Sequence, residues 1–230
     1  MSLPRAVRAV VFDMDGLLVD TEVVFLEAQI LAARARGLEM PRAVALSTIG
    51  RTWPDSAPML AAHFGTGFDV DAWRAEVKAQ YDGIARAAVC LKAGVVELLD
   101  HLEAVAVPRA VATSSSHKSV ERSLGGHGLL ARFDAIVAHG DYQRGKPHPD
   151  PYLKAAQVLG VEPRDCLALE DSHNGVRAAA AAGMMTVMVP DLLEATDEMS
   201  GLCVGIARDL HEVRGLMLSL YSVENCIQFE

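Results

Sequence analysis

Residues 6–16 read AVRAVVFDMDG, and this stretch determines which class of fold the chain can adopt. The mostly apolar run from Ala6 to Phe12 is typical of a fully buried strand in a parallel sheet. The strand should end at Asp13, which is followed after one residue by a second carboxylate, Asp15, and then by Gly16. Because two carboxylates repel each other unless a cation lies between them, we expect this turn to carry chemistry.

The residues after this turn change to a helical pattern. Helical periodicity runs from about Glu22 to Arg36 and should stop at Gly37. The segment 41–58 contains Gly50, Pro54 and Pro58, which predicts a loop with short helices. Asp69 or Asp71 should cap a further helix that ends near Ala87.

From about Cys90 the chain alternates between strands and helices. Short apolar runs predict strands at 108–112, 135–138, 166–169 and 186–189, with helices near 119–124, 151–159 and 175–181. Such alternation predicts an α/β fold with a doubly wound, Rossmann-like parallel sheet. We expect residues 1–17 and 89–230 to form this core and residues 18–88 to form an inserted helical cap domain. The stretch 221–230 is left as a last strand or a loose tail.

Four polar clusters follow predicted strands, at residues 13–16, 113–116, 145–147 and 170–172. Since ligands of open parallel sheets bind outside the carboxyl ends of the strands, these clusters should meet at one edge. Carboxylates from Asp13, Asp15, Glu170 and Asp171 are ligands of the kind that Mg²⁺ prefers. Each cluster alone also fits a turn or a helix cap; together they favour a metal site.

The cluster at 113–116 offers hydroxyls and amides suited to a phosphate oxygen, with Thr113 and Ser114 as candidates. Taken alone, these residues fit ordinary N-capping of the next helix equally well. Lys146 lies in the loop before Pro147, where it could neutralise a phosphate, although an isolated lysine is more often a solvated surface residue. Because the acidic clusters should lie nearby, we favour phosphate binding both for the cluster at 113–116 and for Lys146.

The composition excludes several classes of protein. The net charge of −9 disfavours broad binding to nucleic acid or to an anionic membrane. No secretory leader pattern and no long apolar run is present, and the four cysteines show no paired spacing, so we expect a cytoplasmic protein. No Gly-x-Gly-x-x-Gly follows the first strand, which argues against a dinucleotide-binding domain.

The four clusters resemble, in order, the four motifs of the haloacid dehalogenase superfamily. These are FDMDGLLVDTE at 12–22, TSS at 113–115, GKPHPD at 145–150, and LEDS at 169–172 with Gly175 and Ala178. The resemblance covers the whole chain, with the spacing of the helical-cap branch that includes beta-phosphoglucomutase and sugar-phosphate phosphatases. Dehalogenases of the superfamily lack the second aspartate of the first motif. Asp15 therefore favours phosphoryl transfer over dehalogenation.

The resemblance implies a role for each matching residue. Asp13 would attack phosphorus to form an aspartyl-phosphate, and Asp15 would act as general acid and base. The Asp13 carboxylate, the Asp15 main-chain carbonyl and Asp171 would hold Mg²⁺, with Glu170 as a ligand or directly behind the ligands. Thr113, or alternatively Ser114, would bind the phosphoryl group together with Lys146; strand register favours Thr113.

The substrate remains open at this stage. The expected partner is a small phosphorylated metabolite, a sugar or polyol phosphate, and the protein should be a monomer or weak dimer. Arg51, Trp53 and Lys78 are candidate substrate contacts in the cap. The mutases carry a histidine in the first cap helix, where this chain has Val24 and Phe25, so a phosphatase is favoured over a mutase. A third possibility is a non-catalytic binding or regulatory module on a degraded scaffold.

Overall fold

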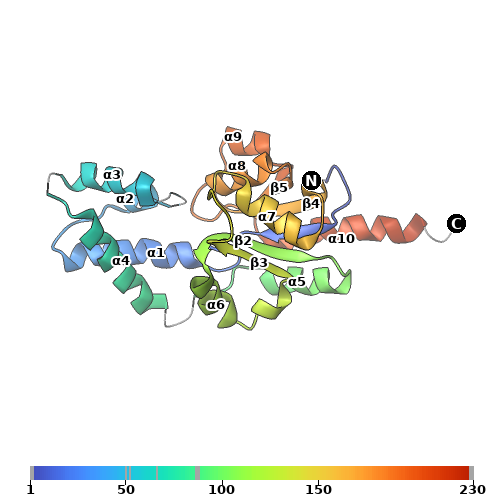
Figure 1. The fold of residues 1–230 in the computed structure, drawn as a ribbon, viewed down its shortest axis with the longest axis horizontal. Coiled ribbons are helices and arrows are strands. Elements are labelled where there is room, and N and C mark those ends of the chain that lie inside the picture. Colours follow the sequence, from blue (N-terminus) through green and yellow to red (C-terminus); the bar gives the residue numbers. More distant parts are fainter. Residues whose placement is uncertain (1–2, 50, 52, 66, 86–88, 228–230) are drawn as a thin grey trace. The chain divides into compact units, whose positions relative to one another are not determined.

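The computed structural model describes residues 3–49, 51, 53–65, 67–85 and 89–227 (Figure 1). The chain forms two compact units. Residues Met1–Val19 and Leu91–Glu230 make up the first, called here the core unit, and residues Asp20–Cys90 make up the second, the helical unit. Every helix in the described part of the chain is too short or too polar to cross a bilayer.

The core unit is built on a six-stranded parallel sheet with the order β3-β2-β1-β4-β5-β6. The first strand along the chain is central in this order, between β2 and β4. The doubly wound parallel sheet expected from the sequence is therefore confirmed. The strands are β1 (Ala9–Phe12), β2 (Arg109–Ser116), β3 (Ala135–His139), β4 (Cys166–Glu170), β5 (Met185–Met188) and β6 (Gly205–Ile206).

Helices cover both faces of this sheet. Figure 1 shows α7 and α8 on one side and α5 and α6 on the other, as right-handed crossovers require. Small side chains let α7 and α8 pack closely, because alanines of both helices meet Ala9 and Val11 of β1 in one buried cluster. On β1 the alternate residue Phe12 makes an edge-on ring contact with Phe133, 5.8 Å between centroids. The helices are α5 (Val95–Ala104), α6 (His117–Gly125), α7 (Asp150–Leu159), α8 (His173–Ala181), α9 (Asp197–Leu202) and α10 (Leu210–Ile227).

The helical unit contains α1 (Thr21–Ala35), α2 (Arg42–Leu46), α3 (Trp53–Phe64) and α4 (Val70–Ala85). Its hydrophobic centre includes Trp73, which is 1% exposed and packs against Phe64 and Phe68. The Asp69 carboxylate accepts hydrogen bonds from the amides of Asp71 and Ala72, so Asp69 caps α4. The expected end of this helix near Ala87 lies outside the described residues.

Two expectations about local structure were wrong, and a third was met in part. The segment 41–58 contains the short helix α2 expected there, but α3 begins within it and includes Pro54 and Pro58. Pro54 lies in the first turn of α3, where backbone amides have no hydrogen-bond acceptor within the helix. The missing N–H of proline is therefore tolerated there. The stretch 221–230 is neither a strand nor a loose tail as far as it is described, because α10 extends to Ile227. Its buried Leu210, Val213 and Met217 follow helical spacing.

The second error concerns the segment after Ala112. The strand expected to end there extends to Ser116 as β2, and Ser116, rather than Thr113 or Ser114, accepts the capping hydrogen bond from Ser119. Regular pairing with β3 is interrupted between Ala112 and Ser116. Thr113 and Ser114 therefore lie on the irregular end of a strand and not in the first turn of a helix.

Candidate active site

Asp13 is held at the carboxyl end of the central strand. Its amide donates to the Leu169 carbonyl oxygen at 3.0 Å, which continues the pairing of β1 with β4. The side chain is buried and accepts a hydrogen bond from the Lys146 ammonium at Oδ1. Burial raises the pKa of Asp13 to about 8; Lys146 opposes this effect, while the nearby carboxylates of Glu170 and Asp15 add to it. The site therefore holds an excess of carboxylates that favours a bound cation.

Asp15 follows Asp13 by two residues, and its carboxylate faces the end of β2. Its Oδ2 accepts a hydrogen bond from the Ser115 hydroxyl at 2.7 Å and a longer one from the Thr113 hydroxyl at 3.4 Å. The Thr113 oxygen also accepts from the Ser115 amide at 3.0 Å. Thr113 is buried and Ser114 is exposed, which agrees with the alternation of a strand. Asp15 is thus oriented by two hydroxyls from a neighbouring strand.

Lys146 arrives from the loop between β3 and α7 and is almost completely buried. Its ammonium also donates to Glu170 Oε1 at 2.5 Å and lies 5.0 Å from the centroid of the Tyr152 ring. Burial alone would lower the pKa of Lys146, but the carboxylates of Asp13 and Glu170 outweigh it and raise that pKa. Lys146 therefore stays a cation at the floor of the site.

Glu170 is the most completely bonded carboxylate at this edge. Its Oε1 accepts from Lys146 and from the Tyr152 hydroxyl at 2.6 Å. Its Oε2 accepts from the amides of Asp171 and Ser172 and from the Ser172 hydroxyl, at 3.1–3.2 Å. With five hydrogen bonds at 0% exposure, Glu170 is fixed in place by β4 and by the start of α8.

Gly175 makes this arrangement possible. A Cβ atom at this position would lie 1.8 Å from Glu170 Oε1, far inside van der Waals contact. The first turn of α8, capped by the Ser172 hydroxyl through the Gly175 amide, therefore sits directly on the Glu170 carboxylate. The sequence motif that pairs LEDS with a glycine five residues after Glu170 thus has a steric reason.

The residues at this edge fit a divalent metal ion. One carboxylate oxygen each from Asp13, Glu170 and Asp171 lies within 4.8 Å of the others, and all three residues are buried. Hard oxygen donors gathered in this way suit Mg²⁺. The Asp15 carboxylate is not part of this group. Of Asp15, only the main-chain carbonyl is then a candidate metal ligand, as the family resemblance implies.

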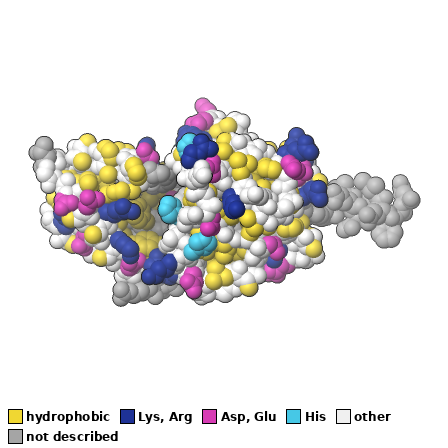
Figure 2. All heavy atoms as spheres, in the orientation of Figure 1, with side chains coloured by type: hydrophobic (Ala, Val, Ile, Leu, Met, Phe, Trp, Pro, Cys, Tyr) yellow, Lys and Arg dark blue, Asp and Glu magenta, His cyan; other side chains and the backbone are white. Residues whose placement is uncertain are grey.

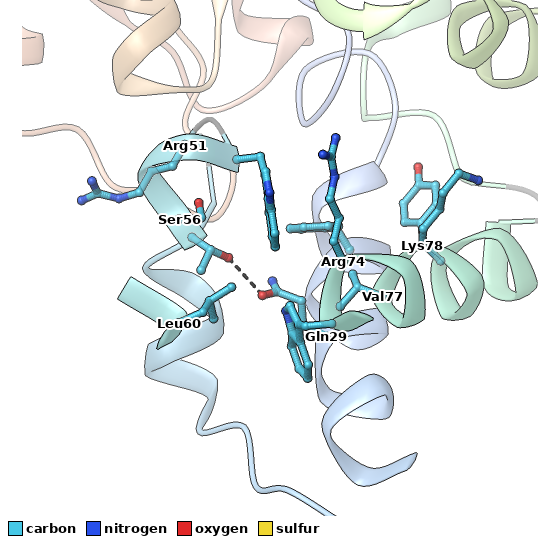
Figure 3. Close-up of a pocket in the computed structure, with 12 residues that line it drawn as sticks. Gln29, Arg51, Ser56, Leu60, Arg74, Val77 and Lys78 are labelled. Atoms are coloured by element: carbon cyan, nitrogen blue, oxygen red, sulfur yellow. Dashed lines mark hydrogen bonds between the residues drawn. The ribbon is translucent and has the colours of Figure 1, made fainter. Parts of the chain in front are cut away.

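Arg51, Trp53 and Lys78, the three candidates from the insert, line one pocket of the helical unit (Figure 3). Arg51 donates from Nε to the Ser47 carbonyl oxygen at 2.8 Å, and Lys78 pairs with Asp82 one turn along α4. The Arg74 guanidinium lies over the Trp53 ring, 5.3 Å from its centroid. The structure thus places all three residues around one cavity.

Several residues of these two sites were not identified from the sequence. Ser115 lies in the TSS motif, but the resemblance implies no role for it, and Tyr152, Gln29 and Arg74 lie outside every motif. The alternation of a strand places Ser115 on the same face as Thr113, and this is the sequence signal that points to it. Tyr152 and Gln29 lie on helices whose buried faces the sequence pattern marks only as apolar.

Surface charge is mixed on both units. Figure 2 shows acidic and basic side chains interspersed with hydrophobic ones on the visible face of each unit. Several of them form exposed ion pairs, such as Arg177 with Glu198 at 2.6 Å. Pairs of this kind contribute little to stability in water.

Comparison with known proteins identifies relatives of this arrangement. A protein of Drosophila melanogaster named "Probable pseudouridine-5'-phosphatase" is 37% identical over 193 residues, which cover 81% of this chain and 83% of that protein. Hexitol phosphatase B of Escherichia coli is 33% identical over 83% of this chain and 86% of its own length. The crystal structure of CbbY from Rhodobacter sphaeroides in complex with phosphate superposes with a TM-score of 0.73 at 25% identity, covering 90% of this chain and 96% of that one.

The match to a family is equally extensive. Residues 7–183 match the haloacid dehalogenase-like hydrolase family, and this range includes all four sequence clusters described above. The matched range also includes β1, the entire helical unit and the residues around Glu170. The chain therefore belongs to the haloacid dehalogenase-like hydrolases.

Proposed function

We propose that this hydrolase is a Mg²⁺-dependent phosphatase that cleaves a small phosphorylated metabolite, a sugar or polyol phosphate, through an aspartyl-phosphate on Asp13. The observation that carries the proposal is the convergence of Asp13, Asp15, Lys146 and Glu170 at one edge of the sheet. Relatives named as phosphatases at 33–37% identity over most of the chain support the same activity.

In the first step, a carboxylate oxygen of Asp13 attacks phosphorus while the alcohol oxygen leaves on the opposite side. Asp15 gives its proton to that leaving oxygen, and Ser115 holds the Asp15 carboxyl in the orientation this requires, while the Thr113 hydroxyl turns from Asp15 to a phosphoryl oxygen. The products of the step are a free alcohol and the aspartyl-phosphate.

In the second step, a water molecule attacks the phosphorus of the aspartyl-phosphate. Asp15, now a carboxylate, takes the proton of that water, and the Asp13 carboxylate is released together with inorganic phosphate. Lys146 and Thr113 bind phosphoryl oxygens in both steps, and the positive charge of Lys146 opposes the negative charge of the transferred group.

The metal ligands we propose are the carboxylates of Asp13 and Asp171 and the main-chain carbonyl of Asp15. Glu170 lies among the same oxygens, but its five hydrogen bonds engage both of its own oxygens, so it acts behind the ligands. When bound there, Mg²⁺ would neutralise charge on the phosphoryl oxygens. The helical unit is the cap of this enzyme in our proposal, and it selects the leaving alcohol.

The test is phosphate release from a panel of phosphorylated sugars, polyols and nucleotides, with Mg²⁺ or with chelator. We expect release with Mg²⁺, none with chelator, and recovery when Mg²⁺ is restored. Release that persists in chelator would contradict the metal requirement. Acid quenching during turnover should trap label on Asp13 that hydroxylamine removes, and label on serine or histidine would refute the nucleophile.

The two alternative functions, a mutase and a non-catalytic binding module, predict different results in these assays. If no ester of the panel releases phosphate, hexose 1-phosphates should be tested for isomerisation, because a mutase would convert them without net release. Neither release nor isomerisation would leave a non-catalytic binding module as the better description of the chain.

A further inference from the structure

The helical unit contains a pocket of about 340 Å³, a size suited to one small ring system (Figure 3). All of its lining residues belong to this unit, so the pocket exists independently of the core unit. Half of the lining is aromatic or aliphatic. These hydrophobic members are Phe25, Trp53, Leu60, Trp73, Val77 and Tyr81.

One polar side chain in this lining is incompletely bonded. Gln29, on α1, is 1% exposed, and its Oε1 accepts a hydrogen bond from the Thr48 hydroxyl at 3.2 Å. Its Nε2 is buried and has no hydrogen-bond partner among the described residues. A buried donor without an acceptor costs about 1–3 kcal/mol of stability. A ligand that supplied an acceptor at this point would remove that cost.

The walls around Gln29 determine which part of a ligand can reach it. Trp73 is buried against Phe64 and Phe68, and Trp53 has its ring faced by the Arg74 guanidinium. Flat hydrophobic walls favour a planar ring, which packs or stacks on aromatic faces. The other half of the lining is polar, but hydroxyls of a polyol chain that faced the hydrophobic half would find no hydrogen bond there, which is unfavourable.

We propose that this pocket binds a planar heteroaromatic ring carried by the substrate's leaving alcohol, and that Gln29 Nε2 donates a hydrogen bond to a ring carbonyl oxygen. The substrate class is therefore a sugar phosphate that bears such a ring, as a nucleoside monophosphate does. This inference rests on the proposed function for the phosphate ester, but the pocket and the unpaired amide stand independently of it.

The first test compares two esters that differ only in the ring. Uridine 5'-monophosphate carries a ring with carbonyl oxygens, and ribose 5-phosphate is the same sugar phosphate without it. We expect kcat/KM with Mg²⁺ to be at least about tenfold higher for uridine 5'-monophosphate, because one hydrogen bond to a buried donor is involved. Equal values, or a preference for ribose 5-phosphate, would overturn the ring proposal and leave the phosphatase proposal standing.

The second test measures ring binding without catalysis. The chain has two tryptophans, Trp53 and Trp73, and both line the pocket. Tryptophan fluorescence therefore reports on this site alone, and uridine, which has no phosphate, should change it in a saturable manner. If no ester is hydrolysed but uridine binds, the proposed function fails and the ring site survives. If uridine produces no saturable change, the ring site is refuted.

The variant Gln29→Leu tests the proposed hydrogen bond. It should lower the preference for uridine 5'-monophosphate over ribose 5-phosphate by about tenfold, mainly through KM. Its melting temperature should be unchanged or higher, because an unsatisfied buried donor is removed. A residue with only a structural role would show a lower melting temperature and the same preference, and that result would contradict the proposal.

Gln80→Leu is the matched control. Gln80 lies on α4 of the same unit, donates to Glu76 at 2.8 Å and does not line the pocket. It should leave the preference between the two esters at the wild-type value. A fall equal to that of Gln29→Leu would show that the effect does not come from the pocket, and would overturn the assignment of Gln29.

Discussion

The edge of the core sheet and the pocket of the helical unit represent two different kinds of site. At the sheet edge, Glu170 accepts five hydrogen bonds within the protein, and the buried Lys146 ammonium donates to Asp13 and Glu170. In the pocket, a lining that is half hydrophobic surrounds the Gln29 amide, whose NH2 group has no acceptor in the described part of the chain. The first site is rigid before any ligand arrives, whereas the second is completed by its ligand.

The largest expected effect separates the two sites by function. Asp13→Asn removes the proposed nucleophile and should lower kcat by at least about a thousandfold, as measured by phosphate release with Mg²⁺. It should leave the fluorescence response to uridine unchanged, because Asp13 is not part of the pocket. The increase in melting temperature that Mg²⁺ gives the wild type should also be largely lost, since one ligand is missing.

Asp71→Asn, at an exposed position of α4, is the control and should keep both activity and the Mg²⁺ effect. Activity of Asp13→Asn near the wild-type level would refute the mechanism. A lost response to uridine in a folded Asp13→Asn protein would show that the two sites are not separable.

The second prediction compares two glycines in helices. Gly175→Ala should destabilise the protein by about 3 kcal/mol or more, because the new Cβ would overlap a Glu170 carboxylate that cannot move away. Gly83→Ala in α4 meets no atom within 4 Å and should stabilise its helix by about 0.5–1 kcal/mol. Chemical denaturation measures both, and a tolerated Gly175→Ala would show that the sheet edge is less rigid than described.

The third prediction compares two buried leucines. Leu167→Ala, in the middle of the core sheet, should cost about 3–5 kcal/mol of unfolding free energy. Leu60→Ala, in the helical unit, should cost less, about 2–3 kcal/mol, because one side of Leu60 already borders the pocket and has fewer neighbours to lose. Equal losses in denaturant unfolding would indicate that the pocket is closed in solution.

The smallest expected effect concerns the orientation of Asp15. Ser115→Ala removes its 2.7 Å hydrogen bond and leaves the 3.4 Å bond from Thr113, so kcat should fall by about tenfold with little change in KM. Ser119→Ala, on the exposed side of α6, serves as the control. A change in KM alone would mean that Ser115 contacts substrate and does not position the acid.

Much of the sheet edge could be predicted from the sequence because parallel topology is restrictive. Once Ala6–Phe12 is identified as a central strand, the carboxyl ends of the other strands must bring Thr113, Lys146 and Glu170 to the same edge as Asp13. The residues that support this edge could not be predicted in the same way. Gly175 appears as part of a motif, but its overlap with Glu170 is visible only in three dimensions.

The pocket was much less predictable. Gln29 lies on a helix where a polar residue normally faces solvent, and nothing in the local pattern shows that it is buried. The same limitation applies to the end of the chain, where residues 221–227 continue a helix rather than form a strand. Packing between helices depends on residues far apart in the sequence, which periodicity alone does not describe.

The central position of β1 has a consequence for how the enzyme is made. Val10 pairs with Arg109 on one side and with Leu167 on the other, so the strand that leads into Asp13 leaves the ribosome long before either neighbour. The contacting residues of the helical unit lie closer together in the sequence. This unit can therefore fold before the strands that pair with β1 have been synthesised. Lys146 and Glu170 are also synthesised late. A nascent chain therefore carries the proposed nucleophile, Asp13, well before Lys146 and Glu170 are made, and the sheet edge is complete only after β4 has paired with the first strand.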